Sequence, residues 1–146
     1  MKPLVYLAGK MGGRLGADVL AERGKAIRAC KKAGVGYIDP AENENISPDA
    51  VVDLAMSFEQ MRRFVSKDEY AIRQCDVILV LTADTPSEGT GIEIGLALAL
   101  HMPVVLVSPK RVAGTLMGFW SCKADAMFNT VEEAVKYIAD TYRRYD

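Results

Sequence analysis

The sequence predicts a single α/β domain built on a doubly wound sheet of about five parallel strands. Strand-like and helix-like segments alternate along most of the chain, as they do in folds of this class. Two short runs, 77–81 and 104–107, are apolar throughout, which is typical of parallel strands covered on both faces. The 146 residues, 50% of them apolar, suit one domain with one core, and no linker, repeat or low-complexity segment divides residues 1–146.

The first part of the chain is predicted to form a strand, a helix and a second strand. Residues 4–7 are an apolar run that stops at Gly9. A helix follows, because apolar and small residues recur at helical spacing. It ends at Gly34. The recurring residues are Leu20, Gly24, Ile27 and Cys30. The second strand covers 35–38 and closes at Asp39-Pro40.

A long helical region is predicted in the middle of the chain. Ser47 is placed to cap a helix, and Pro48 suits its first turn. Its apolar stripe comprises Val51, Leu54, Phe58, Met61 and Val65. The segment 66–69 has the form of a capping box, so a new helix or a kinked continuation runs from there to about Cys75, with Asp68 in its first turn.

The last part of the chain continues the alternation. A helix is expected over 92–100, between the two apolar strands, and a further strand over 126–128. Residues 130–133 have the capping-box form and open a final helix. Its apolar stripe comprises Val131, Val135, Ile138, Tyr142 and Tyr145. This order of elements favours a flavodoxin-like fold.

Charge and composition exclude several classes of function. With 18 basic and 19 acidic residues the formal net charge is -1, which provides no general attraction to nucleic acid or to an anionic membrane. No apolar run is long enough to span a bilayer, and residues 1–3 lead directly into a strand, so we expect a soluble cytoplasmic protein without a signal peptide. Three separated cysteines and one histidine are too few for a disulfide framework or a zinc site. Buried thiols are expected at Cys30, Cys75 and Cys122.

The loop after the third strand is one place where a ligand is expected, because sheets of this kind bind ligands at the carboxyl ends of their strands. It carries Ser87, Gly89, Gly91 and Glu93 at the start of a helix. The glycines allow close approach to the backbone, and the helix presents N–H groups and the positive end of its dipole. Glu93 in the first turn is favoured as the anion, which suits a nucleophile. A helix-terminal acid paired only with the dipole is the alternative.

The loop after the first strand is rich in glycine and carries two cations. Gly9, Lys10 and Arg14 form an arrangement able to hold a phosphate or a sugar. Its spacing matches neither the dinucleotide-binding fingerprint nor a P-loop. A solvated turn with two exposed basic residues is the alternative interpretation.

Three pieces of the sequence resemble one known family. They are residues 6–9, Tyr6-Leu7-Ala8-Gly9; Asp68, eight residues ahead of Asp76; and residues 89–97, Gly89-Thr90-Gly91-Ile92-Glu93-Ile94-Gly95-Leu96-Ala97. Together they resemble the nucleoside 2-deoxyribosyltransferase superfamily, which also contains the 2'-deoxynucleoside 5'-phosphate N-hydrolases. The resemblance covers residues 6 to about 117. It implies a flavodoxin-like fold, an oligomer, and cleavage of an N-glycosidic bond with no metal and no organic cofactor.

The resemblance also implies roles for three side chains. Glu93 matches the nucleophile that attacks the anomeric carbon, Asp68 the acid that assists proton transfer to the base, and Tyr6 the tyrosine that orients the nucleophile. A nucleophilic carboxylate and a second acid suit an oxocarbenium-like transition state. With Glu93 at a helix N-terminus and Asp68 partly buried, the pKa values of these two groups would be separated as their roles require. A capping-box acid at Asp68 and a core aromatic at Tyr6 are the alternatives.

Ser87 bears on the choice between nucleosides and nucleotides. At this position, six residues before the nucleophile, the transferases carry an acid that serves the sugar's 5'-hydroxyl, whereas the phosphate-using hydrolases carry a serine. A serine admits a 5'-phosphate and can donate a hydrogen bond to it. Lys10 and Arg14 lie in the loop that helps bind the phosphate in the hydrolases, although the hydrolases' G-S-I-R-G-G run is not reproduced here.

The resemblance extends to a segment that a neighbouring subunit contributes to the active site. Thr115 falls near the phosphate-binding serine of the hydrolases, and Leu116-Met117 matches a Leu-Met pair of the transferases. We therefore expect a homodimer or a higher homo-oligomer whose active site is completed by the partner.

The function expected from these observations is cleavage of the N-glycosidic bond of (deoxy)nucleoside 5'-monophosphates through a covalent glycosyl-Glu intermediate, with release of the free base. A nucleoside 2-deoxyribosyltransferase that exchanges bases on 2'-deoxynucleosides uses the same intermediate and is the close alternative. A nucleotide-binding module without turnover is the non-enzymatic alternative, against which the pair Asp68 and Glu93 argues. The partner in each case is a small molecule.

Overall fold

The computed structural model describes residues 1–42, 44–109 and 123–145. In chain order its elements are β1 (Leu4–Ala8), α1 (Gly16–Ala33), β2 (Gly36–Ile38), α2 (Phe58–Gln74), β3 (Val77–Val80), α3 (Glu88–Ala99), β4 (Val104–Val107), β5 (Ala126–Phe128) and α5 (Val131–Thr141). The alternation of strands and helices predicted from the sequence is confirmed. None of the helices in this part of the chain combines the length and hydropathy that crossing a membrane requires.

Five strands form one parallel sheet in the order β2-β1-β3-β4-β5. This is the strand order of flavodoxin-like folds, so the predicted fold class is confirmed. From β1 the chain first winds outward to β2 and later returns to place β3 on the other side of β1. Such a reversal opens a crevice at the carboxyl ends of the two strands beside it, which here are β1 and β3.

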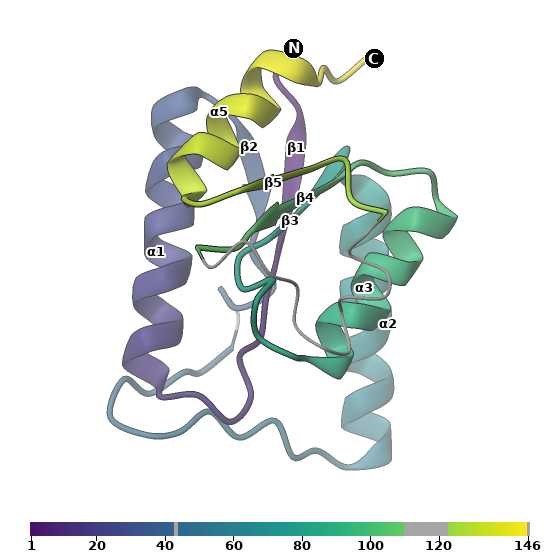
Figure 1. The fold of residues 1–146 in the computed structure, drawn as a ribbon. Coiled ribbons are helices and arrows are strands. Elements are labelled where there is room, and N and C mark those ends of the chain that lie inside the picture. Colours follow the sequence, from purple (N-terminus) through teal and green to yellow (C-terminus); the bar gives the residue numbers. More distant parts are fainter. Residues whose placement is uncertain (43, 110–122, 146) are drawn as a thin grey trace.

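Two helices cover each face of the sheet (Figure 1). α1 and α5 pack on one face, and α2 and α3 pack on the other. Side chains alternate between the two faces along β1: Leu7 packs toward α1 and α5, whereas Tyr6 packs toward α2 and α3. Tyr6 is therefore directed toward the helices that carry Asp68 and Glu93.

The two apolar runs noted in the sequence form the centre of the core. Every residue of β3 and β4 is buried. Burying one Val, Leu or Ile side chain stabilises a fold by about 1.5–3 kcal/mol, so these two strands give the sheet a firm centre. The loops that carry the candidate site leave the sheet from β3 and from its neighbour β1.

The predicted helix start at Ser47 is wrong, because α2 begins at Phe58. Its N-terminus is a capping box in which the Gln60 backbone N–H donates to the Ser57 hydroxyl oxygen (3.2 Å) and the Ser57 N–H donates to the Gln60 side-chain oxygen (3.0 Å). From there α2 runs without a break to Gln74. The second helix start predicted at 66–69 is therefore also wrong.

The segment before α2 is held by backbone hydrogen bonds to the turn ahead of α1. The Val52 N–H donates to the Arg14 carbonyl (2.7 Å), and the Gly16 N–H donates to the Ala50 carbonyl (2.8 Å). These long-range bonds satisfy backbone groups that a helix would otherwise use. The periodic apolar residues upstream of Phe58 therefore do not become helical.

Two smaller differences concern helix positions. α3 begins at Glu88, earlier than predicted, which places Glu93 in its second turn. The buried positions of α1 include Val19 and Arg23, whereas Leu20 is exposed. The predicted N-cap of the last helix is confirmed at Thr130, whose side chain accepts a hydrogen bond from the Glu133 N–H. Cys30 and Cys75 are buried free thiols as expected, and Cys122 lies outside the described residues.

Candidate active site

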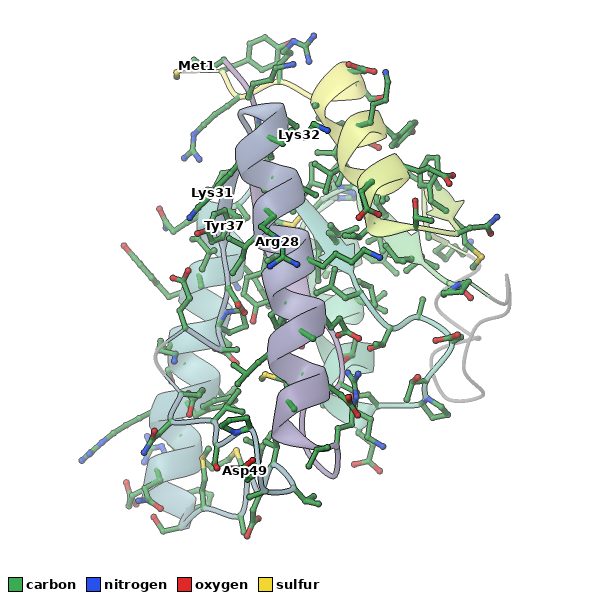
Figure 2. All side chains as sticks on the ribbon, turned by 90° about the vertical axis from the view of Figure 1, so that its left-hand side faces the viewer. Met1, Arg28, Lys31, Lys32, Tyr37 and Asp49 are labelled. Carbon is green, nitrogen blue, oxygen red and sulfur yellow. The ribbon has the colours of Figure 1, made fainter. Side chains whose placement is uncertain are left out.

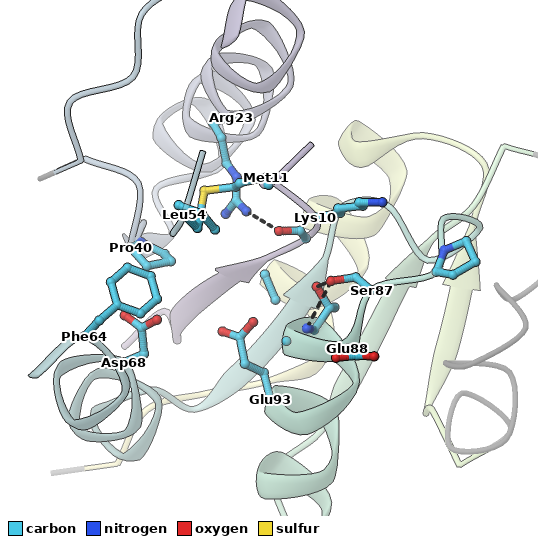
Figure 3. A pocket seen from close by; sticks show the side chains of 16 residues that line it. Lys10, Met11, Arg23, Pro40, Leu54, Phe64, Asp68, Ser87, Glu88 and Glu93 are labelled. Carbon is cyan, nitrogen blue, oxygen red and sulfur yellow. Dashed lines mark hydrogen bonds between the residues drawn. The ribbon is translucent and has the colours of Figure 1, made fainter. Parts of the chain in front are cut away.

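A cleft of about 390 Å³ opens at the carboxyl ends of β1 and β3 (Figure 3). This volume lies within the range of small-molecule sites. The lining residues come from the loop after β1, from α1, α2 and the start of α3, and from the segments around residues 40 and 54. The cleft is thus located where the reversal of strand order predicts a ligand site.

Hydrogen bonds join the loops after β1 and β3. The Lys10 N–H donates to the Thr82 hydroxyl (3.0 Å), and the Leu81 N–H donates to the Ala8 carbonyl (2.8 Å). Gly9 lies between these contacts with a φ of +152°, and a Cβ atom there would be 3.1 Å from the Thr82 hydroxyl. Only glycine meets both the conformation and the space at this position, which keeps the floor of the cleft open.

Tyr6 lies beneath the cleft and is completely buried. Its hydroxyl faces Glu93, and burial, followed by the negative charge of Glu93, raises the pKa of Tyr6 far above its usual value. The contact does not complete a hydrogen bond with good geometry, and the hydroxyl has no other partner among the described residues. A buried phenol next to a carboxyl group is suited to orient that group, as the family resemblance implies for Tyr6.

Glu93 projects from α3 into the middle of the cleft. Burial has the largest effect and raises the pKa of Glu93 to about 7. The interaction with Tyr6 and the positive charge of Arg23 act to lower this pKa, whereas the negative charge of Asp68 acts to raise it. The expectation that the helix dipole would favour the anion is therefore wrong. The expected separation of the pKa values is wrong as well, because the pKa of Glu93 lies above that of Asp68, which is about 6. In the second turn the dipole acts weakly, and the loss of solvent around the side chain outweighs it.

Asp68 faces the cleft from the middle of α2. Burial has the largest effect and raises the pKa of Asp68 to about 6. The positive charges of Lys67 and Arg23 act to lower this pKa, whereas the negative charge of Glu44 acts to raise it. One carboxylate oxygen is buried without a hydrogen-bond partner in the described part of the chain. Because Asp68 is central in α2, the capping-box interpretation of this residue is wrong.

The other end of the cleft is formed by the start of α3 and by Lys10. The Ser87 hydroxyl oxygen caps α3, accepting from the Thr90 N–H (3.3 Å) and from the Thr90 hydroxyl (3.1 Å). Its own hydrogen remains to be donated. Glu88, which is exposed, also lines this end and adds a carboxylate to it.

Comparison with known proteins places the chain in a family. The family model described as nucleoside 2-deoxyribosyltransferase matches residues 5–134. The chain belongs to the nucleoside 2-deoxyribosyltransferase family. This match spans both loops of the cleft as well as Asp68 and Glu93. The resemblance noted in the sequence is confirmed, and the family consists of enzymes that act on the glycosidic bond of nucleosides or nucleotides. No curated protein matches the chain.

Solved structures share the fold of this family member. A 2-deoxyribosyltransferase from Bacillus psychrosaccharolyticus is 24% identical, with a TM-score of 0.70 over 92% of this chain and 91% of that one. A conserved protein from Enterococcus faecalis V583 is 16% identical, with a TM-score of 0.66 over 97% and 100%. A CMP N-glycosidase from Clostridium botulinum is 20% identical, with a TM-score of 0.56 over 92% and 96%.

The structure brings most of the predicted site residues together in this family member. Those that line the cleft are Gly9, Lys10, Asp68, Ser87, Gly89 and Glu93. Gly91 lies one turn into α3 and outside the lining, and a Cβ atom there would have open space. Arg14 is not among the residues that line the cleft; its guanidinium group pairs with Glu22 (3.1 Å) and donates to the Lys10 carbonyl (2.8 Å). Thr115 and Met117 lie outside the described residues.

Sequence reasoning missed two features of the site. One is Arg23, a buried arginine that lines the cleft. The sequence does indicate its position, because Arg23 falls between Val19 and Ala26 at the helical spacing of the residues that α1 buries. The other is an apolar wall, for which no sequence signal existed because its members come from separate segments. The wall comprises Met11, Pro40, Leu54 and Phe64.

Proposed function

We propose that this family member hydrolyses the N-glycosidic bond of (deoxy)nucleoside 5'-monophosphates and releases the free base. The observation that carries the proposal is the position of Glu93 between two different ends of the cleft (Figure 3). On one side lie Asp68 and the apolar wall, and on the other lie Ser87 and Lys10. A nucleotide has the same order of parts: a base, a sugar and a 5'-phosphate.

The chemistry follows from the two carboxyl groups. A Glu93 carboxylate oxygen attacks C1' of the sugar, the bond from C1' to the base breaks, and Asp68 donates its proton to the departing base. Asp68 then takes a proton from water, the water oxygen attacks C1', and the bond to Glu93 breaks. The products are the free base and the sugar 5-phosphate, and both residues return to their starting states. Tyr6 beneath Glu93 orients the attacking carboxylate.

The apolar wall is suited to the base. Phe64 precedes Asp68 by one helical turn on α2, so an aromatic ring and an acid lie next to each other on the same face. Stacking of a base on the ring would hold the base edge near the Asp68 proton. Met11 and Leu54 line the same end of the cleft and supply further apolar contact.

The opposite end is suited to a phosphate. Lys10 provides a cation, and the Ser87 hydroxyl can donate to an anionic oxygen because its lone pairs already accept from Thr90. The N-terminus of α3 adds the positive end of the helix dipole. An acid at the Ser87 position would repel a phosphate, so the serine supports a nucleotide substrate.

Glu88 supports a second candidate, deoxyribosyl transfer between bases on 2'-deoxynucleosides. Its carboxylate lines the 5' end of the cleft and would disfavour a phosphate while accepting a hydrogen bond from a free 5'-hydroxyl. The description of the matched family names this reaction. Hydrolysis and transfer share the glycosyl-Glu93 intermediate and differ in whether water or a second base attacks it.

A homo-oligomer in the cytoplasm belongs to the same proposal. In it, Thr115 and Met117 of a neighbouring subunit would complete the 5' end of the cleft. The family resemblance supports this arrangement.

The test is a chromatographic assay of released base. Nucleosides and their 5'-monophosphates, with ribose and with deoxyribose, are incubated with the wild type and with Glu93→Ala, in the presence and absence of an acceptor base. We expect base release from monophosphates without an acceptor and a loss of roughly 10³-fold or more in Glu93→Ala. Exchange that needs an acceptor and occurs only on unphosphorylated deoxynucleosides would establish the transferase instead. Binding without any turnover would contradict both enzymes.

A further inference from the structure

Arg23 is a charged side chain inside the wall of the cleft. It projects from α1, is 3% exposed and lines the site (Figure 3). Its Nε atom is buried without a hydrogen-bond partner among the described residues. An arginine is seldom so fully buried unless its charge is compensated or used.

The guanidinium group of Arg23 holds the carboxyl end of β1. One terminal nitrogen donates to the Leu7 carbonyl (2.6 Å), and the other donates to the Gly9 carbonyl (2.8 Å). These carbonyls lie on either side of the point where the chain leaves the sheet toward Lys10. Because the guanidinium fork is planar and rigid, two simultaneous bonds define the direction in which the loop departs.

Asp39 holds Arg23 in this position. Its carboxylate lies 3.3 Å from an Arg23 nitrogen, both side chains are 3% exposed, and the same carboxylate oxygen accepts from the Ala41 N–H at 3.0 Å. A buried ion pair is often no more stabilising than a well-packed apolar pair. Stability alone therefore gives little reason for this pair, whereas its location at the cleft gives a functional one.

The charge of Arg23 acts on both reacting carboxyl groups. It lowers the pKa of Glu93 and the pKa of Asp68, against the effect of burial. The other groups that face Glu93 are Tyr6 from β1 and Asp68 from α2. Asp68 itself is also faced by Lys67 of its own helix and by Glu44. Among the described residues, Arg23 is thus the positive charge that acts on both carboxyl groups.

We propose that Arg23, anchored by Asp39, is a positioning residue that fixes the Gly9–Lys10 loop and favours the ionised form of the nucleophile Glu93. The role assigned to Glu93 rests on the proposed function. The contacts of Arg23 and its charge do not depend on that function, so the two can be tested separately.

The first measurement is the titration of the Glu93 and Asp68 carboxyl groups by carbon-13 NMR. We compare the wild type with Arg23→Met, Arg23→Lys and Asp39→Asn. Both midpoints move upward in Arg23→Met and stay near those of the wild type in Arg23→Lys and Asp39→Asn, which keep the positive charge. The matched control is Arg28→Met on the same helix, because Arg28 is exposed on its outer face (Figure 2). Unchanged midpoints in Arg23→Met would overturn the proposal.

The second measurement is the pH profile of kcat/KM for base release in the same variants. We expect Arg23→Met to shift the acid limb of the profile to higher pH and to lower kcat/KM by about tenfold or more. We expect Arg23→Lys to lose activity without a shift of the acid limb, because it keeps the positive charge and loses only the planar guanidinium group. An acid limb that does not move in Arg23→Met contradicts the proposal. If the wild type releases no base from any substrate, the proposed function fails, and the NMR titration still decides on Arg23.

Arg23→Met leaves Asp39 buried without its counter-ion, which is strongly destabilising and can prevent folding. The double variant Arg23→Met with Asp39→Asn removes both charges and retains an acceptor for the Ala41 N–H. We expect it to fold and to show the same upward shift of the Glu93 midpoint. A folded double variant with a wild-type midpoint would overturn the proposal.

Discussion

Glu93 and Asp68 face one cleft, and burial raises the pKa of both, to about 7 and about 6. The negative charge of Asp68 also raises the pKa of Glu93. Two interacting carboxyl groups lose their protons in steps that belong to the pair. The form with one proton is therefore most abundant near neutral pH. Because the pKa of Glu93 lies above that of Asp68, most of these molecules carry the proton on Glu93, and the proposed mechanism uses the minor form in which Asp68 holds it.

The first prediction concerns pH. We expect a bell-shaped dependence of kcat/KM on pH, with its maximum between about 6 and 7, because activity needs one protonated and one ionised carboxyl group. Initial rates of base release at low substrate concentration, across pH 4.5 to 9, measure the profile. A profile that keeps rising above pH 8 would show that no carboxylic acid donates a proton to the base.

The second prediction concerns stability. The pKa of Glu93 is raised from 4.5 to about 7 in the folded chain, so the unfolded chain binds fewer protons in this range and stability falls as the pH rises through it. Glu93→Gln removes this penalty. With allowance for partial exposure, its free energy of unfolding should exceed that of the wild type by ~1–2 kcal/mol at pH 8 and by little at pH 4.

Urea unfolding of both proteins at the two pH values tests this second prediction. The control is Asp49→Asn, since Asp49 is exposed in the segment ahead of α2. A Gln variant less stable than the wild type at pH 8 would contradict the penalty.

The third prediction concerns Ser87. Ser87→Asp should lower kcat/KM for a nucleoside 5'-monophosphate at least about tenfold more than for the nucleoside, because a carboxylate would repel the phosphate. Aspartate is as good a helix cap as serine, so α3 should keep its start. Ser87→Asn is the neutral control. Equal losses on both substrates would remove the case for a phosphate at this end.

The candidate site could be predicted in part from the sequence. Glu93 belongs to a local motif, and Asp68 and Ser87 were identified by their distance from such a motif. All three line the cleft as expected. The order of the pKa values of Glu93 and Asp68 was predicted wrongly, since burial depends on segments far away in the chain. Arg23 was missed because an arginine in a helical stripe gives no sign of which carbonyl groups it will reach.

At the scale of single elements, α1 shows how a glycine can be required by packing. A Cβ atom on Gly16 would lie 1.8 Å from the Ser47 carbonyl oxygen, whereas one on Gly24 would meet only the flexible end of Arg28 at 3.2 Å. The first contact is with backbone and cannot be relieved by a side-chain rotation. The start of α1 and the segment ahead of α2 are thus fitted to each other.

The fourth prediction follows from this difference. Gly16→Ala should destabilise the chain by ~2 kcal/mol or more, because the backbone must move. Gly24→Ala should stabilise it by about 0.5–1 kcal/mol through the better helix propensity of alanine. Thermal unfolding of the two variants beside the wild type makes the comparison. A Gly16→Ala protein with wild-type stability would contradict the close packing at this point.

The same pair of segments explains why one helix start was predicted wrongly. The periodic apolar residues begin at Val51, but the chain becomes helical only at Phe58. Hydrogen bonds to the turn ahead of α1 hold the intervening backbone in place, and a local pattern contains no information about them. The strands were predicted well because complete burial leaves an uninterrupted apolar run in the sequence itself.

At the scale of the whole molecule, α2 is covered on one side only. Ile72 is its one buried residue among those described, while Phe58 is 75% exposed and Val65 is 53% exposed. Met61 lies between them on the same face and is also exposed. An apolar face of this kind usually marks an interface. The expected homo-oligomer would cover it.

The fifth prediction is that the chain self-associates through this face of α2. Phe58→Glu with Val65→Glu should shift the protein to the monomer in analytical ultracentrifugation, because two charges would be buried without partners. Exchanging exposed Tyr70 of the same helix for Glu is the control for added charge. A wild type that is monomeric at high micromolar concentration would contradict the prediction.

The strand order has a consequence for how the chain folds. Contacts that join β1 to the region of β3 span 72 residues, as between Lys10 and Thr82, and every pair of neighbouring strands is parallel, so no local hairpin can nucleate the sheet. Folds dominated by such distant contacts form slowly. A chain emerging from the ribosome has α1 and α2 before β3 arrives, but it has no cleft until β3 and α3 have docked. The cleft therefore requires closure of the central sheet, and a chain that stops short of α3 has no site.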